Sequence, residues 1–342
     1  MPPVKRIEPD RPTLAERLVN WLPGPYFFKC LFFWIIFGTP GMVLSRYLDT
    51  LNFEKTMALF GVLSIQNVIL FSLTSFVMPL YSFLAIRYMR LKIVEKKPEL
   101  NQVTVVGAST VERAFASIPK LLPAAIFAVL VGVVSSVSFP AQSQNVAGVL
   151  SLIVKVVGVA VSIFAYGTFI WVYVSSIRGL YRLGGEKLRF VQFYEDKHLG
   201  MKPFGAVSFS LAWVYFIGVG LGFFNLDPLN ILLLLPLFAL MALGVILFFL
   251  PLYKVHAKMK IEKRTIETSL NERLRKVVDL PESNEEKSNE VADLITFQIL
   301  EQKLLKISGW PFDTATLRWF SAVVISVLGT IIARSLLHFI GL

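Results

Sequence analysis

Residues 229–252, LNILLLLPLFALMALGVILFFLPL, run for 24 positions without one charged side chain. A helix needs about 20 mostly apolar residues to cross the hydrocarbon core of a bilayer, so this stretch predicts a transmembrane helix. Beyond it the chain becomes polar, but apolar residues continue at helical spacing on one face. The members of this stripe are Val255, Met259, Ile266, Leu270, Leu274 and Val277. We therefore expect one helix that leaves a membrane and continues outside it as an amphipathic helix.

The composition of the whole chain agrees with a membrane protein. Of its 342 residues, 55% are hydrophobic and 17% are charged, whereas soluble domains average about 45–50% apolar and about 25% charged residues. These values exclude an ordinary cytosolic enzyme and a disordered chain. The single cysteine, Cys30, excludes an intramolecular disulfide. The fold class that follows is all-α, a polytopic integral membrane protein.

Seven apolar stretches are candidates for membrane spans, and the basic residues orient them. We place the spans at residues 27–44, 57–86, 121–138, 146–174, 204–224, 229–252 and 317–339. Lys and Arg gather on the cytoplasmic side of membrane spans. With the N-terminus inside, 28 of the 34 basic residues fall in cytoplasmic segments and 2 fall outside. We therefore expect a cell (plasma or inner) membrane protein with a cytoplasmic N-terminus and an external C-terminus. The net charge of +11 then reports orientation, and we expect no nucleic-acid partner.

The spans divide the chain into four parts. These are a cytoplasmic N-terminal segment (1–26), a six-helix membrane domain (27–252), a cytoplasmic helical hairpin (253–316) and a C-terminal transmembrane helix (317–342). Pro281 ends the first arm of the hairpin, and Ser283 with Glu286 forms a capping-box pattern for a second helix. Two interpretations of the hairpin stay open. It is a stalk that packs on itself, or it pairs with another copy of the chain or with another protein.

Cationic and amide side chains inside the predicted spans suggest one binding site. Lys155, Arg334, His338, Gln66 and Asn67 fall at a similar outer depth of the spans. Ionisable residues inside a membrane often mark function, so these five side chains predict an outward-facing pocket for an anion, a carboxylate or a lipid phosphate. The alternative is that the two long basic side chains extend to the interface and the others bond between helices.

The loop after the fourth predicted span mixes basic and aromatic residues. Arg178, Arg182, Lys187 and Arg189 accompany Phe190, Phe193 and Tyr194. This pattern favours contact with the anionic lipids of the inner leaflet. Glu195, Asp196 and His198 are also metal-binding residue types, but three polar residues in one exposed loop are weak evidence. We expect no metal site and no cofactor.

Catalytic motifs do not occur in the sequence. It has no HExxH, GxSxG or phosphate-loop pattern, and its three histidines lie far apart along the chain. We therefore expect no enzyme. The function that the pattern favours is a non-catalytic membrane scaffold, sensor or assembly protein that acts through its hairpin. The alternative is a channel or transporter for an anion or anionic small molecule, built on the cationic pocket.

Overall fold

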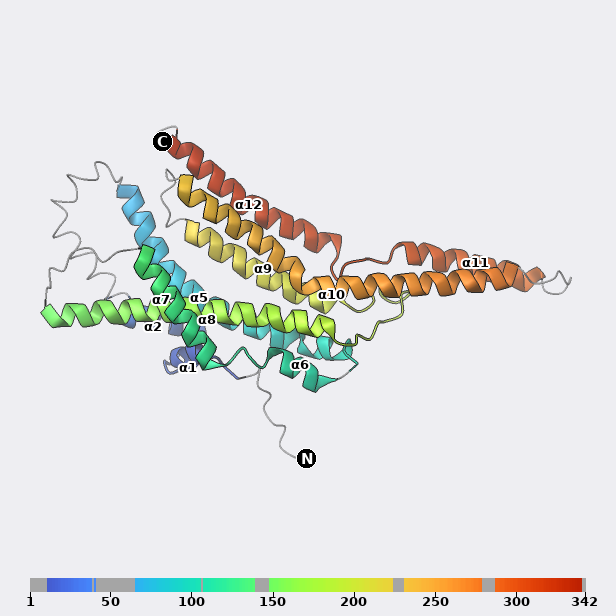
Figure 1. Ribbon diagram of the computed structural model, residues 1–342, viewed down its shortest axis with the longest axis horizontal. Coiled ribbons are helices and arrows are strands. Elements are labelled where there is room, and N and C mark those ends of the chain that lie inside the picture. The colour runs from blue at the N-terminus through green and yellow to red at the C-terminus, as the bar shows by residue number, and fades with distance from the viewer. Residues whose placement is uncertain are drawn as a thin grey trace, which may run out of the picture.

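The computed structural model describes residues 11–38, 40, 65–105, 107–138, 148–223, 231–278 and 287–339. Within these ranges it contains ten helices and no strand, so the all-α fold class is confirmed (Figure 1). The helices are α1 Leu14–Asn20, α2 Tyr26–Phe37, α5 Ile65–Gln102, α6 Ala108–Phe115, α7 Leu121–Ser138, α8 Gly148–Gly185, α9 Lys202–Phe223, α10 Ile231–Val278, α11 Lys287–Leu305 and α12 Thr314–Phe339.

Three of the described helices contain segments long and apolar enough to cross a membrane. The segments are Val156–Gly185 of α8, Lys202–Gly222 of α9 and Phe238–Arg275 of α10. Shorter apolar segments occur in α2, α7 and α12. Of the first predicted span, 27–44, residues 27–37 lie in α2, which has 12 residues, whereas residues 39 and 41–44 lie outside the described residues. The described helices thus support membrane association, and the count of seven spans stays a prediction.

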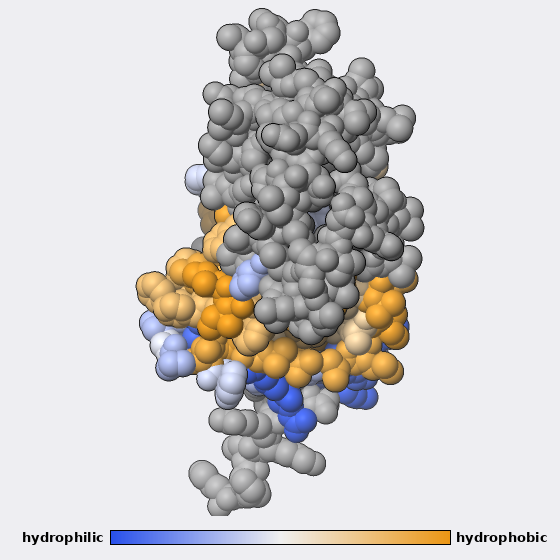
Figure 2. Space-filling view, turned by 90° about the vertical axis from the view of Figure 1, so that its left-hand side faces the viewer, coloured by the Kyte–Doolittle hydropathy of each residue, from blue (hydrophilic) through white to orange (hydrophobic). Residues whose placement is uncertain are grey.

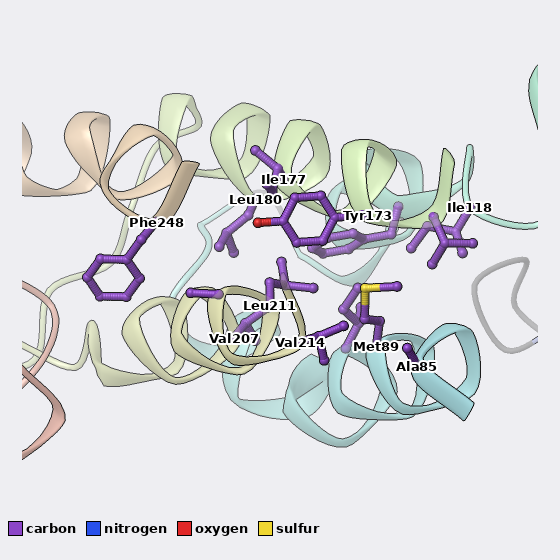
Figure 3. Packing of buried hydrophobic residues seen from close by; sticks show 14 of the residues in the cluster. Ala85, Met89, Ile118, Tyr173, Ile177, Leu180, Val207, Leu211, Val214 and Phe248 are labelled. Carbon is purple, nitrogen blue, oxygen red and sulfur yellow. The ribbon is translucent and has the colours of Figure 1, made fainter. Parts of the chain in front are cut away.

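A bundle of α5, α8, α9 and α10 holds most of the buried apolar side chains. Figure 3 shows Leu211 and Val214 of α9 pointing toward Tyr173 of α8, with Met89 of α5 beside them. Helix α7 crosses α8 at Gly167, where an added Cβ would lie 2.3 Å from the backbone of Ala128. Small residues allow helices to approach this closely, and the bundle positions the two connections that form the candidate site.

The outer surface of the bundle is apolar. On α7 and α12, which pack against the bundle, Leu122, Val129 and Trp319 are each exposed by about two thirds of their surface or more. Figure 2 shows apolar residues gathered in a belt on one face, with hydrophilic residues below the belt. Large contiguous apolar surfaces are rare on soluble monomers. Such a belt suits contact with lipid tails.

Helices α10 and α11 lie side by side and project from the bundle as a hairpin (Figure 1). Helix α10 has 48 residues, which at 1.5 Å per residue gives a length of about 72 Å. The predicted apolar stripe faces inward at its base, where Val255 and Met259 are buried. Farther out, Ile266 and Leu270 are half-buried. The predicted capping box of Ser283 and Glu286 lies outside the described residues.

At the other end of the chain, α1 is fixed to α5 by an ion pair. Thr13 caps α1, and its backbone N–H and hydroxyl donate to the carboxylate of Glu16 at 2.9 and 3.1 Å. The same carboxylate accepts from Nε of Arg90 at 2.9 Å and from Nη2 at 2.9 Å. Glu16 is 1% exposed. We call this contact the N-terminal anchor, and it joins two charged groups in a bidentate geometry.

Candidate functional site

The connection between α8 and α9, residues 186–201, folds around one carboxylate. Asp196 accepts hydrogen bonds from the backbone N–H groups of His198, at 3.1 Å, and Gly200, at 3.0 Å. These bonds hold Leu199 and Gly200 at φ values of 53° and 81°, a conformation that non-glycine residues rarely adopt. The turn directs two side chains inward, so that His198 is 1% exposed and Leu199 is fully buried.

The buried leucine of this turn packs against the base of the hairpin. Leu199 forms an apolar cluster with Leu304 of α11 and with Ile307, which follows α11. Phe190, Phe193 and Ile266 pack around this cluster. The α8–α9 loop therefore contacts both arms of the hairpin through apolar side chains.

Polar contacts join the same loop to the linker between α11 and α12, residues 306–313. The backbone N–H of Ser308 donates to the carbonyl of Lys197 at 2.9 Å. Nδ1 of His198 lies 3.3 Å from the carbonyl oxygen of Trp310. Nδ1 of His256, on α10, lies 2.5 Å from the carbonyl oxygen of Gly309. Two histidines thus bind consecutive carbonyls of one linker. We call the contacts among Asp196, Lys197, His198, His256, Ser308, Gly309 and Trp310 the junction.

Aromatic packing connects the junction to the bundle. The indole of Trp310 stacks on the ring of His256, with centroids 4.1 Å apart and an angle of 15° between the ring planes. The indole also packs against Phe249 of α10 and Phe312 of the linker. The start of α9 also lies against the linker, because a Cβ on Gly205 would lie 2.1 Å from the carbonyl oxygen of Pro311. The linker is held by α9, α10 and the α8–α9 loop together.

The acceptors in the junction determine the protonation of His198. A carbonyl oxygen only accepts, so Nδ1 of His198 carries a hydrogen, and in the neutral ring Nε2 then carries a lone pair. Nε2 is buried and has no hydrogen-bond partner. Burial lowers the pKa of His198, although the hydrogen bond to Trp310 and the charge of Asp196 act in the opposite direction. The neutral imidazole is therefore the form that the junction favours.

The carboxylates near the junction have their own partners. Burial raises the pKa of Asp196, but the N–H groups of His198 and Gly200 and the charge of Lys202 outweigh it, so the pKa stays below its usual value. Asp313 caps α12 by accepting from the N–H and the hydroxyl of Thr316, both at 2.8 Å. These two bonds hold the pKa of Asp313 below its usual range. Both carboxylates are thus committed to local structure as anions.

A cavity of about 600 Å³ borders the α8–α9 loop on the side of α5. Its lining comes from the end of α5, from the loop and from the start of α9, and consists of Glu99, Gln102, Val103, Arg189, Phe190, Val191, Gln192, Glu195, Gly200 and Pro203. The loop thus packs against the hairpin on one side and borders this cavity on the other. Its first residues are tied to the end of α5 by the backbone bonds from Val105 to Lys187 and from Arg189 to Val103.

The loop residues that the sequence singled out have different roles in the structure. Phe190 and Phe193 pack in the cluster at the base of the hairpin, whereas Tyr194 is 48% exposed. Asp196 uses its oxygens to hold the turn. Among the described residues, no group of three His, Cys, Asp or Glu side chains has a metal-binding arrangement. Contact of the exposed basic residues with anionic lipid stays a prediction.

The predicted outer pocket falls where side chains are not described. Gln66 and Asn67 belong to α5, Lys155 belongs to α8, and Arg334 and His338 belong to α12. Helix α5 packs against α8, whereas α12 packs against α9. The side chains of all five residues lie outside the described residues. The anion or lipid-phosphate pocket therefore stays a prediction.

No protein-family model, no curated protein and no solved structure matches this chain. The junction itself was missed by sequence reasoning, which treated the histidines as unrelated because of their separation. His198 and Trp310 are 112 residues apart, and His256 and Gly309 are 53 apart. The predicted hairpin held a usable signal for the second pair. His256 lies near its beginning and Trp310 near its end, and the two arms of an antiparallel hairpin bring such positions together.

Proposed function

We propose that this protein is a non-catalytic membrane scaffold or sensor that presents its hairpin to a partner and couples the hairpin to its membrane helices. The observation that carries this proposal is the continuity of α10. One helix, Ile231–Val278, contains a segment apolar enough to cross a membrane and also forms the first arm of the hairpin. A force on the hairpin is therefore transmitted along one element, and the junction ties the returning chain to the same bundle.

The outer face of α11 supports a binding role. Ile295 and Ile299 are each 52% exposed and lie one helical turn apart, on the side opposite the buried Leu304. The two arms of the hairpin also differ in charge. Residues 253–278 contain eight basic and three acidic side chains, and residues 279–305 contain two basic and seven acidic ones. Opposite charges attract the two antiparallel arms to each other, and those on the outer faces favour association with a second copy or with another charged helical protein.

The proposal includes the topology expected from the sequence: seven spans in a cell membrane, a cytoplasmic N-terminus and hairpin, and an external C-terminus. Cysteine labelling in intact cells tests it. In a Cys30→Ser background, Ser269→Cys in the hairpin is expected to be protected from a membrane-impermeant thiol reagent. Ser143→Cys, in the predicted outer link, is expected to react. The reverse pattern, or equal reaction at both positions, would contradict the topology.

Cross-linking of the full-length protein in its own membranes tests the binding role. We expect a cross-linked product at α11 in the wild type and its loss in the double variant Ile295→Glu, Ile299→Glu. The control is Gln298→Glu, Gln302→Glu, which adds the same charge at two exposed polar positions of α11. A product that survives equally in both variants, or that forms in neither the wild type nor the control, contradicts the proposal.

Flux measurements distinguish the scaffold proposal from the alternative function, an anion channel or transporter. Purified protein in liposomes is expected to pass no chloride if the scaffold proposal is right. Chloride flux that Lys155→Met or Arg334→Met abolishes would favour the alternative instead.

A further inference from the structure

We propose that the junction is a pH-sensitive latch in which neutral His198 holds the α11–α12 linker against the α8–α9 loop and protonation of its ring releases the linker. The inference rests on the proposed function, because the latch determines whether the hairpin moves together with the membrane helices. Its basis is geometric: a fully enclosed imidazole that joins two separate connections and has one ring nitrogen without a partner.

The latch is closed when the linker is held against the α8–α9 loop and open when it is released. The neutral ring of His198 fits the closed latch. Nδ1–H of His198 donates to Trp310, 112 residues away, and this bond lies beside the one from Ser308 to Lys197. The unpartnered Nε2 costs little as a lone pair, because an unsatisfied acceptor is tolerated better than a buried unsatisfied donor. The closed latch therefore selects one tautomer of the neutral ring.

The protonated ring does not fit. A proton taken from solvent by Nε2 creates a buried N–H donor with no acceptor and places a full charge in an enclosed site. Leaving such a donor unsatisfied carries the full desolvation penalty of the group. When the ring moves into water to be solvated, its bond to Trp310 breaks, and the linker separates from the loop.

The charged groups around the ring relieve this cost only in part. In its own loop, the charge of Asp196 attracts a cation, but its oxygens are committed to the turn, and Lys197 repels a cation. From α9, Lys202 pairs with Asp196 at 3.4 Å and also repels a cation. From the linker, Asp313 is committed to the cap of α12. The groups on α10 that reach the same linker are His256 and Lys263, and Nζ of Lys263 donates to the carbonyl of Ile307 at 3.3 Å.

The direction of the pH response follows from the lowered pKa of His198. In the open state the ring is hydrated and titrates near the ordinary histidine pKa of about 6.5. The open state therefore binds more protons than the closed state below that pH, so the latch is fully stable above about pH 6.5 and weakens as the pH falls. Asp196 and Asp313 stay ionised across this range because their pKa values are lowered. The weakening of the latch at lower pH is therefore assigned to histidine.

The second histidine of the junction behaves differently. The ring of His256 is half-buried, so part of it already reaches solvent. Nδ1 of His256 lies 2.5 Å from the carbonyl oxygen of Gly309, and the ring stacks on the indole of Trp310, so His256 holds the linker through two contacts that do not involve the α8–α9 loop. The linker is therefore expected to stay with α10 and to leave the α8–α9 loop.

Hydrogen–deuterium exchange of the full-length protein in phospholipid nanodiscs tests the latch. Protection of residues 306–313 is compared at about pH 7.5 and about pH 5.5, the range in which histidine titrates, after scaling to an unfolded reference peptide. In the wild type we expect a several-fold loss of protection at the lower pH. In His198→Asn, which places an amide N–H at the Nδ1 position and does not titrate, we expect equal protection at both values. Residues 165–177 of α8 serve as the internal control and are expected to stay protected throughout.

Three results would overturn the latch. The first is a wild type whose protection does not change with pH. The second is a His198→Asn variant that loses protection as the wild type does, and the third is a His256→Asn variant in which the response disappears while His198 is intact. The measurement needs no partner. A flat profile therefore overturns the latch and leaves the cross-linking test of the scaffold proposal unaffected. Absence of the cross-linked product in both the wild type and the control overturns the scaffold proposal alone.

Discussion

The N-terminal anchor and the junction attach two peripheral segments to the same bundle by opposite chemistry. The anchor joins the carboxylate of Glu16 to the guanidinium of Arg90, so both partners are charged and each satisfies the other. The junction joins a neutral imidazole, His198, to a backbone carbonyl. A charged pair is costly to break because it leaves a buried charge. A neutral histidine contact is weaker and depends on one proton, so the comparison separates a fixed attachment from a conditional one.

The largest expected effect comes from breaking the anchor. Glu16→Ala removes the carboxylate from Arg90, whose side chain is 12% exposed, and also removes half of the capping box of α1. Removing one partner of a buried pair typically costs about 3–5 kcal/mol. We expect the free energy of local opening of α1, measured by hydrogen–deuterium exchange, to fall by about that amount. The double variant Glu16→Leu, Arg90→Leu is expected to recover most of the loss, and a single variant that costs under about 1 kcal/mol would show that the pair does not hold α1.

Steric crowding at the junction is expected to have the next largest effect. Gly205→Ala places a Cβ 2.1 Å from the carbonyl oxygen of Pro311, so the linker or α9 must shift. Overpacking of this kind costs about 1–3 kcal/mol. The control is Gly220→Ala on the same helix, where the nearest atoms belong to Val327 at 3.9 Å. We expect exchange protection of residues 306–313 to fall in the first variant only, and an equal effect of both variants would contradict the close approach.

Removing the carboxylate that holds the turn is expected to cost less. Asp196→Ala deletes the acceptor of two backbone N–H groups, a loss of about 1–2 kcal/mol in the stability of the α8–α9 loop. Because the pKa of Asp196 is lowered, its contribution is complete above the usual aspartate pKa of about 3.9 and disappears as the pH falls below it. The loop of the wild type is expected to lose this stability in acid, while the variant lacks it at every pH. A variant loop that is still destabilised by acid would assign that response to another group.

The sequence reveals α10 and the junction to very different degrees. An uncharged run followed by a stripe at helical spacing is a local signal, and it predicted both the apolar segment of α10 and the amphipathic arm that follows. The junction depends on contacts across 112 and 53 residues and on a turn in which Leu199, a residue type with no preference for positive φ, adopts 53°. Neither feature leaves a periodic pattern. The neutral state of His198 is likewise a property of its burial, which only the packed loop and linker create.

The smallest effect on stability is expected from Lys202, and it is the most informative about the latch. Lys202 is exposed, and its pairing with Asp196 at 3.4 Å is a surface contact, so Lys202→Met is expected to change stability at about pH 7.5 by no more than about 1 kcal/mol. The same lysine lowers the pKa of His198 by repelling its charged form. Without it, the closed latch tolerates the imidazolium better, and less protection of residues 306–313 is lost at about pH 5.5 than in the wild type. Lys260→Met, at an exposed site on α10, is the control and is expected to keep the full response. If both variants respond to pH as the wild type does, the charges around His198 do not set the latch, and the contrast with the charged anchor fails at that point.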